Sequence, residues 1–280
     1  MILVADSGTT KTEWCMINES GAFETVITPG INPFYQETEN ISAILQKEFT
    51  AAKKFEAIYF YGTGCINEEK QNVVKKALLQ VFEVGSIFLG SDLLAAAHSL
   101  CQDKPGFACI LGTGSNSCYY NGSEIVANVS PLGFILGDEG SGAVMGKKLI
   151  GDVLKKQLPQ LLINDFFETY PTTAAEILEN VYKKPFPSRY LANYTKFLSK
   201  NIKHCEIENI VTSSFREFIT RNLLLYPEID QKPIHFTGSI AFHFEAQLRK
   251  VVEEQHLILG NIERAPMGGL VKYHNSRVTL

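Results

Sequence analysis

The sequence lacks a long apolar segment, an excess of positive charge and any pair of closely spaced cysteines. In its 280 residues no stretch approaches the ~20 apolar residues that a membrane-spanning helix needs. The net charge of −4 gives no electrostatic basis for binding nucleic acid or an anionic membrane, so we expect small molecules as partners. The first apolar run stops at Asp6 without a basic flank, and we expect it to be a strand rather than a signal peptide.

The six cysteines are scattered without a CxxC motif, and several lie in apolar, strand-like runs. This distribution predicts buried free thiols in a reducing cytoplasm, not a disulfide framework or a metal-binding cluster. Hydrophobic residues make up 45% of the chain and charged residues 20%, which is ordinary for a globular protein. A length of 280 residues suits two domains.

What the sequence does contain is a short apolar run that leads into a small polar turn near its start. Residues 2–5 are apolar, residues 6–12 read DSGTTKT, and apolar residues resume at Trp14. Small hydroxyl residues around Gly8 allow backbone N–H groups to point toward a phosphate, with Thr9, Thr10 and Lys11 beside them. An ordinary hairpin turn would look similar, so this turn is weak evidence by itself.

A second copy of this pattern strengthens the interpretation. Residues 107–120 read FACILGTGSNSCYY, and the turn consists of Gly112, Thr113, Gly114 and Ser115. The repeat predicts a duplication in which each half begins with a three-stranded meander. Asp6 in the first copy corresponds to Ile110 in the second, so we expect the first turn to handle a metal ion and the second only phosphate.

Between the two copies, strand-like and helical segments alternate, which predicts parallel strands joined by crossover helices in an α/β fold. Asn32 lies in the proline-punctuated loop 28–34, where its amide could recognise a ligand hydroxyl or simply shape the turn. Asp92 follows a strand and starts a helix, the place where open α/β sheets bind ligands. It could also cap that helix, as Ser91 could equally well.

The second half contains the stretch PLGFILGDEGSG, residues 131–142, with two acids among four glycines and a helix expected after Ser141. Such a backbone can approach a ligand closely, with Asp138 at its centre. The following SGAVMGKK resembles a nucleotide P-loop only superficially, because Ser141 stands at its first glycine and Lys148 at the metal-binding hydroxyl.

The remainder of the second half predicts a helical insertion over residues 143–230. The apolar face of a helix at 205–226 is expected in the core or in a homodimer contact. A strand at 234–236 then leads into Gly238 and Ser239 at the start of a helix, another point of ligand approach. A strand at 257–259 and a closing helix at 265–274 complete the chain.

Together these motifs resemble the N-acetylglucosamine kinase and BadF/BadG/BcrA/BcrD ATPase-like family of the actin, hexokinase and Hsp70 superfamily. The motifs, in order, are DSGTTKTE, LGTGSNS, GDEGS, FTGSIAF and MGGL. The resemblance implies two ribonuclease H-like lobes of the actin and hexokinase type that face a central nucleotide cleft. The first lobe would comprise residues 1–102 and 266–280, and the second residues 103–265 with the helical insertion.

The resemblance also implies roles for single residues. Asp6 would orient Mg²⁺ through water, Asp92 would be the catalytic base, and ATP would be the phosphoryl donor. The phosphates would contact Thr9, Thr10, Lys11 and residues 112–115, the adenine would lie beside Gly238 and Ser239, and the sugar would contact Asn32, Asp92, Asp138 and Ser141. Family members usually have more glycine in the first motif, where this chain has Ser7 and Thr9.

The sequence therefore predicts a cytoplasmic, ATP-dependent kinase for an amino sugar, with N-acetylglucosamine as the expected acceptor. Two alternatives remain open at this point. One is an ATPase of the same fold that activates a partner enzyme, and the other is a sugar or nucleotide sensor without turnover.

Overall fold

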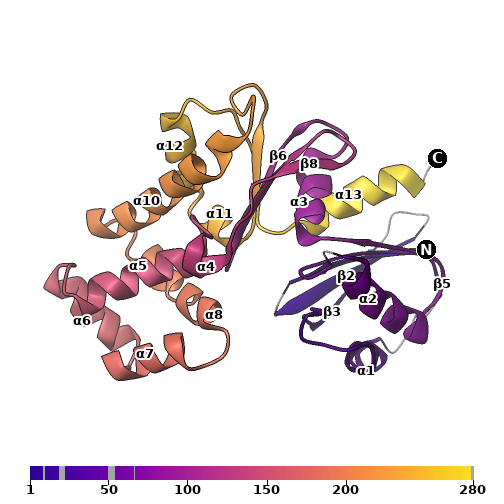
Figure 1. Ribbon diagram of the computed structural model, residues 1–280, viewed down its shortest axis with the longest axis horizontal. Coiled ribbons are helices and arrows are strands. Elements are labelled where there is room, and N and C mark those ends of the chain that lie inside the picture. The colour runs from indigo at the N-terminus through magenta and orange to yellow at the C-terminus, as the bar shows by residue number, and fades with distance from the viewer. Residues whose placement is uncertain (9, 19–22, 50–53, 66, 279–280) are drawn as a thin grey trace. The chain divides into compact units, whose positions relative to one another are not determined.

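The computed structural model describes residues 1–280 apart from 9, 19–22, 50–53, 66 and 279–280. The chain divides into two compact units, which we call unit 1 (residues 1–104 and 265–280) and unit 2 (residues 105–264). A five-stranded sheet forms the centre of each unit (Figure 1).

In unit 1 the strand order is β3-β2-β1-β4-β5. The first three strands are antiparallel, and β4 and β5 extend the sheet in parallel with β1. The strands are β1 (Ile2–Ser7), β2 (Lys11–Ile17), β3 (Phe23–Pro29), β4 (Lys54–Gly62) and β5 (Glu83–Gly90). The helices are α1 (Thr38–Glu48), α2 (Glu68–Val81), α3 (Asp92–Cys101) and α13 (Met267–Val278).

The side chains of β1 alternate between two hydrophobic clusters, as the period of a strand requires. Leu3 and Ala5 pack in a cluster that includes residues of α1 and α2. Ile2 and Val4 pack in a second cluster that includes residues of α3 and α13. Figure 1 shows these two helix pairs on opposite sides of the sheet. Because helices cover both faces, the ends of the strands are where the sheet of unit 1 can present polar groups to a ligand.

Unit 2 repeats this topology with the strand order β8-β7-β6-β9-β10. Its strands are β6 (Gly106–Leu111), β7 (Ser115–Tyr120), β8 (Ile125–Asn128), β9 (Ile234–Thr237) and β10 (Leu259–Glu263). Its helices are α4 (Gly133–Leu136), α5 (Gly142–Leu154), α6 (Gln160–Thr169), α7 (Ala174–Tyr182), α8 (Pro187–Ala192), α9 (Thr195–Lys200), α10 (Cys205–Arg221), the 3₁₀ helix η1 (Leu223–Leu225), α11 (Ser239–His243) and α12 (Glu245–Glu254). The two sheets bear out the predicted α/β fold of two lobes related by duplication.

Helices α5 to α10 and η1 occupy the stretch between the meander and β9, where the sequence predicted a helical insertion. The predicted apolar face of α10 is buried in the core of unit 2. The helix ends at Arg221, five residues earlier than expected, because residues 223–225 form the 3₁₀ helix. The last strand begins at Leu259 and not at Leu257, whose N–H donates to the Val252 carbonyl oxygen at the end of α12.

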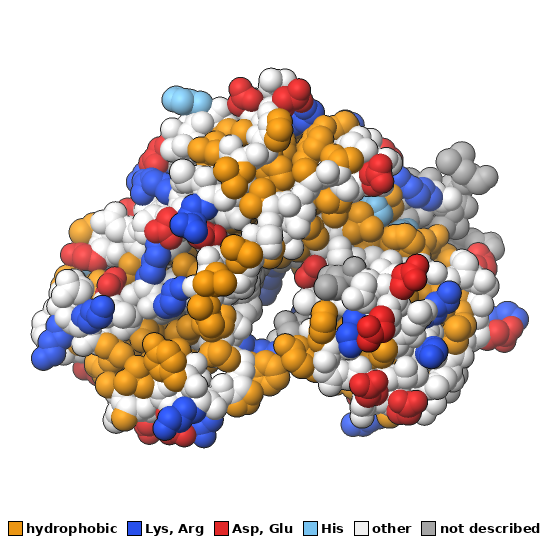
Figure 2. All heavy atoms as spheres, viewed as in Figure 1, with side chains coloured by type: hydrophobic (Ala, Val, Ile, Leu, Met, Phe, Trp, Pro, Cys, Tyr) orange, Lys and Arg blue, Asp and Glu red, His pale blue; other side chains and the backbone are white. Residues whose placement is uncertain are grey.

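Five of the six cysteines are buried, and Cys205 at the start of α10 is exposed. Burial raises the pKa of the Cys65 and Cys101 thiols to about 12, so both remain protonated. On the face shown in Figure 2, acidic and basic side chains are interspersed. Within the part of the chain that the structure describes, no helix combines the length and apolarity needed to cross a bilayer.

Candidate active site

In unit 1 the candidate residues gather where β1 and β4 end. Asp6 is the penultimate residue of β1 and lies opposite Tyr61 of β4. The Thr63 N–H donates to the Ser7 carbonyl oxygen over 3.1 Å and ties the two strand ends together. Burial raises the pKa of Asp6 to about 7, and the negative charges of Asp92 and Glu13 add to this effect. A carboxylate in this position is electrostatically unsatisfied, which favours binding of a cation.

Asp92 is the first residue of α3, and the structure separates it from the capping role. Ser91 is the N-cap, and its hydroxyl accepts a hydrogen bond from the Leu94 N–H over 3.2 Å. The Asp92 Oδ2 atom accepts a hydrogen bond of 2.9 Å from the Thr63 hydroxyl, and Oδ1 accepts one of 2.9 Å from the Leu93 N–H. Burial raises the pKa of Asp92, while these two bonds oppose the rise. The result is an oriented carboxylate with an elevated pKa, as general bases require.

Asn32 is buried, and it both shapes its own turn and keeps donors available. Its Oδ1 atom accepts a hydrogen bond of 3.0 Å from the Phe34 N–H. Its Nδ2 group makes no hydrogen bond to any described residue. Gly64, with φ +91°, packs so closely that a Cβ there would lie 2.6 Å from Asn32 Oδ1. The Oδ1 atom therefore shapes the turn, and recognition of a ligand hydroxyl by the Nδ2 group stays a prediction.

The first predicted phosphate turn joins β1 to β2. The Gly8 N–H donates to the Lys11 carbonyl oxygen over 3.0 Å, which closes the turn. Thr10 and Lys11 are exposed, and Lys11 Nζ lies 3.5 Å from a carboxylate oxygen of Glu13. Thr9, the remaining candidate in this turn, lies outside the described residues.

The second predicted phosphate turn joins β6 to β7 in unit 2. The Gly112 N–H donates to the Gly114 carbonyl oxygen over 2.9 Å, and Thr113 is exposed at the tip. The carbonyl oxygens of Gly112 and Thr113 accept hydrogen bonds from the N–H groups of Gly142 and Ala143, over 2.8 and 3.1 Å. The turn is thus fixed to the first turn of α5, directly after the GDEGS sequence.

Asp138 lies against this second turn. Its Oδ1 accepts a hydrogen bond of 3.3 Å from the Ser115 N–H, and its backbone is left-handed with φ +54°. Burial raises its pKa, and the bond from Ser115 lowers it. Ser141 is fully buried, and its hydroxyl caps α5 by accepting from the Val144 N–H over 3.2 Å. Contact of either side chain with a sugar stays a prediction.

Gly238 and Ser239 lie at the end of β9. Gly238 has φ +114°, and a Cβ there would lie 2.3 Å from the Leu111 carbonyl oxygen, so only glycine fits. Leu111 immediately precedes Gly112, so this segment borders the second turn. The hydroxyl of Thr237 is buried without a hydrogen-bond partner among the described residues. Unit 2 therefore brings its candidate residues together at the end of β6.

Three further residues, to which the sequence analysis gave no role in the site, hold these candidates in place. Ser7 and Thr63 connect the strand ends of unit 1, as the bonds above show. In unit 2, Glu139 Oε1 forms an ion pair of 2.5 Å with Arg221 Nε, and its Oε2 accepts from the Asn222 amide over 3.2 Å. The only sequence signal for Thr63 was its place directly after a strand, in a Thr-Gly pair.

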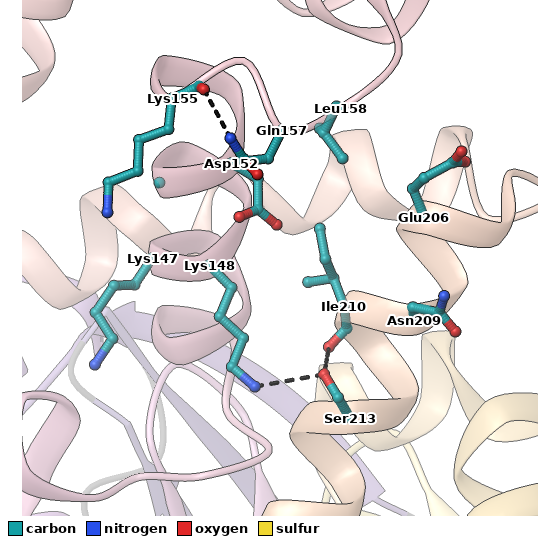
Figure 3. A pocket seen from close by; sticks show the side chains of 11 residues that line it. Lys147, Lys148, Asp152, Lys155, Gln157, Leu158, Glu206, Asn209, Ile210 and Ser213 are labelled. Carbon is teal, nitrogen blue, oxygen red and sulfur yellow. Dashed lines mark hydrogen bonds between the residues drawn. The ribbon is translucent and has the colours of Figure 1, made fainter.

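A groove of about 500 Å³ in unit 2 lies apart from these residues, between α5 and α10 (Figure 3). In Figure 3, Lys148 of α5 points toward Ser213 of α10, and its ammonium donates to the serine hydroxyl over 3.4 Å. None of the candidate residues named above lines the groove.

Oxygen donors suit a hard cation such as Mg²⁺, and Asp6 offers a carboxylate of this kind. Among the described residues, no group of three or more His, Cys, Asp or Glu side chains is arranged to hold a metal ion directly. A carboxylate at Asp6 fits a magnesium ion that keeps most of its water ligands. The buried positions of Cys15, Cys109 and Cys118 do not fit an iron–sulfur cluster on exposed thiolates.

Comparison with known proteins places the chain in a family. No family model matches the sequence, and no curated protein matches it. Among solved structures, the chain is 44% identical to the "Putative N-acetylglucosamine Kinase" of Porphyromonas gingivalis, with 99% of this chain and 100% of that chain covered and a TM-score of 0.95.

Two more distant structures share the fold. A protein of the same description from Chromobacterium violaceum is 16% identical, with 97% and 98% of the chains covered and a TM-score of 0.71. A ROK family glucokinase from Streptomyces griseus, in complex with glucose and AMPPNP, is 14% identical, with 97% of each chain covered and a TM-score of 0.55. The chain belongs to the family of the P. gingivalis protein, the N-acetylglucosamine kinase-like family.

Proposed function

We propose that this protein is an ATP-dependent sugar kinase that transfers the γ-phosphoryl group of ATP to a hydroxyl of an amino sugar, with N-acetylglucosamine as the preferred acceptor. The observation that carries the proposal is Asp92. Asp92 lies just after the end of β5, and burial raises the pKa of its carboxyl group. Ser91, and not Asp92, is the N-cap of α3. The name of the P. gingivalis relative, at 44% identity, supports the same substrate class.

In this proposal Asp92 accepts the proton of the sugar hydroxyl as the hydroxyl oxygen bonds to the γ-phosphorus and the bond to the leaving ADP oxygen breaks. General base catalysis of this kind contributes roughly 10²- to 10⁴-fold to the rate. Asn32 would direct its amide donors, which bond no described residue, toward another sugar hydroxyl, and Asp138 and Ser141 would complete the sugar contacts. Because Asp92 is already oriented by two hydrogen bonds, little reorganisation is needed during proton transfer.

The phosphates would be held by Thr9, Thr10 and Lys11 of the first turn and by residues 112–115 of the second, and the adenine would lie beside Gly238 and Ser239. Mg²⁺, held by Asp6 through water, would neutralise charge on the phosphoryl oxygens. Burial and the negative charges of Asp92 and Glu13 raise the pKa of Asp6 to about 7, and a bound cation would favour the ionised carboxylate.

The decisive experiment is a coupled assay of ADP release with ATP, Mg²⁺ and a series of sugars: N-acetylglucosamine, glucosamine, glucose and N-acetylmuramic acid derivatives. We expect the largest kcat/KM for N-acetylglucosamine, and we expect Asp92→Asn to lower kcat by roughly 10²- to 10⁴-fold. Asp165→Asn is the matched control, because Asp165 binds Lys200 and Asn201 in the helical insertion, on elements without a candidate residue. Sugar-independent ADP release, or wild-type turnover by Asp92→Asn, would contradict the proposal.

A further inference from the structure

The two residues that follow the carboxyl end of β4 by one and two positions, Thr63 and Gly64, contact Asp92 and Asn32. The proposed function places both of these side chains against the sugar. The Thr63 hydroxyl donates to Asp92 Oδ2 over 2.9 Å. The next residue, Gly64, packs against Asn32 so closely that a Cβ would lie 2.6 Å from its Oδ1. Asp92 and Asn32 are 60 residues apart in sequence, yet they contact two consecutive residues, Thr63 and Gly64.

A buried hydroxyl holds the other side of this arrangement. Ser7 is fully buried, and its Oγ donates to the Ile31 carbonyl oxygen over 3.0 Å and accepts from the Ile31 N–H over 3.1 Å. Its Oγ also lies 2.6 Å from the Thr12 hydroxyl. Ile31 directly precedes Asn32, so the Ser7 hydroxyl ties the loop that carries Asn32 to the end of β1. The Ser7 carbonyl oxygen in turn accepts the Thr63 N–H.

These contacts form one continuous connection from Asn32 through Ser7 and Thr63 to Asp92. A glycine at position 7 could accept the bond from the Thr63 N–H but could not make the bonds to Ile31, because it has no hydroxyl. The three hydrogen bonds of the buried Ser7 hydroxyl therefore depend on its side chain and not on the backbone of the turn.

We propose that Ser7 and Thr63 are positioning residues that fix the spacing between Asn32 and Asp92, and thereby choose which sugar hydroxyl meets the base. The inference rests on the proposed function, since it takes the sugar to lie on these two side chains. Ser7 acts on the recognition of the sugar through the loop of Asn32, and Thr63 acts on the orientation and the proton affinity of Asp92. Neither residue touches a reacting atom.

The two roles predict different kinetic changes. Thr63→Val removes the hydroxyl and keeps the shape, so kcat should fall by roughly 10- to 100-fold through misplacement of the base. Because the lost bond stabilised the ionised carboxylate, the pKa of Asp92 should rise, and the acid limb of the kcat/KM profile should move to higher pH. Thr63→Ser restores the hydroxyl and should restore both quantities.

Ser7→Ala should instead raise the KM for the sugar by about 10-fold and the KM for ATP by less, because two of the lost bonds hold Ile31 beside Asn32 and one holds Thr12 in the first turn. Ser7→Thr keeps a hydroxyl and serves as the conservative counterpart. A Ser7→Ala enzyme with the wild-type KM for sugar would overturn the role of Ser7.

A measurement without turnover separates this inference from the proposed function. The Asp92 carboxyl carbon is titrated by NMR in the free wild type, Thr63→Val and Thr63→Ser proteins, with Asp92→Asn identifying the signal. We expect an upward shift of the Asp92 pKa in Thr63→Val alone, and an unchanged pKa would overturn the role of Thr63. If the wild type shows no sugar-dependent ADP release, the proposed function fails, and the titration still decides whether Thr63 controls Asp92.

Discussion

The two units share one strand order but place different chemistry at equivalent positions. At the end of β1, unit 1 has Asp6, whose pKa is raised to about 7, and at the corresponding place in β6 unit 2 has Ile110. The acid near the second turn, Asp138, comes from a later loop and already accepts a bond from the Ser115 N–H. Topology thus fixes where polar groups can be presented, and the residue at each strand end decides what they can do.

The comparison also separates two ways of holding a turn. The second turn is held mainly by backbone bonds, from Gly142 and Ala143 to the carbonyl oxygens of Gly112 and Thr113. The first is held by side-chain hydroxyls, since Ser7 and Thr12 are buried and bonded to each other. Substitutions should therefore affect the first turn through lost hydrogen bonds and the second through backbone conformation.

Among the changes that test this comparison between the units, the largest effect should come from exchanging the acid that distinguishes the two copies. We expect Asp6→Asn to lower turnover at saturating Mg²⁺ by roughly 10- to 100-fold, because a ligand that acts through water would be lost. Ile110→Asn at the equivalent position should change turnover far less. ADP release as a function of Mg²⁺ concentration measures both variants. Equal losses in the two variants would break the proposed division of work between the copies.

A second prediction concerns the backbone of unit 2. Gly238→Ala should lower the free energy of unfolding by about 1–3 kcal/mol, because φ is +114° and the new Cβ would meet the Leu111 carbonyl oxygen. Gly151→Ala in α5 is the matched control, since a Cβ there meets nothing within 4 Å and alanine favours the helix by up to about 1 kcal/mol. Denaturant unfolding distinguishes the two, and a Gly238→Ala protein as stable as Gly151→Ala would be inconsistent with the strain.

The pH dependence of the free energy of unfolding should show how much the ionised Asp6 carboxylate destabilises the folded state. Folding raises the pKa of Asp6 to about 7, so the folded state holds a proton that the unfolded state releases from about pH 4 upward. Its contribution to stability therefore falls as pH rises between these two values and is constant above pH 7.

Without Mg²⁺ and nucleotide, Asp6→Asn should melt above the wild type at pH 8, and the difference should shrink toward pH 4. Thermal unfolding followed by circular dichroism across this range tests the expectation. A gap between the two proteins that is independent of pH would contradict it.

The smallest effect is expected at the ion pair beside Asp138. Glu139→Gln weakens the contact with Arg221, a largely exposed side chain, and should change the free energy of unfolding by less than about 1 kcal/mol. The bond from Asn222 can persist, so we expect only a several-fold rise in the KM for sugar. The matched variant is Glu217→Gln, which weakens the ion pair between Lys148 of α5 and Glu217 of α10. Kinetics and unfolding of both variants would show whether a change in KM depends on the position of Glu139 or only on the loss of a negative charge.

Much of the fold could be predicted because its cues are local. The apolar run of residues 2–5 and the hydroxyl and glycine turns are visible in short windows of sequence. The end of α10 and the start of β10 could not be predicted in this way. Leu223 to Leu225 continue the apolar pattern of α10 but form a 3₁₀ helix. The N–H of Leu257 bonds the Val252 carbonyl oxygen at the end of α12 and so does not join the strand.

The candidate site divides along the same line. Asp6, Asp92 and Asn32 could be named because each stands at a strand end or in a stiff loop. The hydrogen bonds that hold these residues in place could not be predicted. Ser7 bonds Ile31, which is 24 residues away in the sequence, and Thr63 bonds Asp92, which is 29 residues away. Such pairings depend on which strands become neighbours, and one sequence does not show this directly.

The solitary solvent-facing thiol of Cys205 gives the chain a natural attachment point for a spectroscopic probe. Maleimide reagents react with accessible thiolates, and the thiols of Cys65 and Cys101 stay protonated and covered near neutral pH. A dye would therefore attach at the first residue of α10, the helix whose other end carries the Arg221 partner of Glu139. Its fluorescence could report on that helix while sugar and nucleotide are added, without engineering a new cysteine.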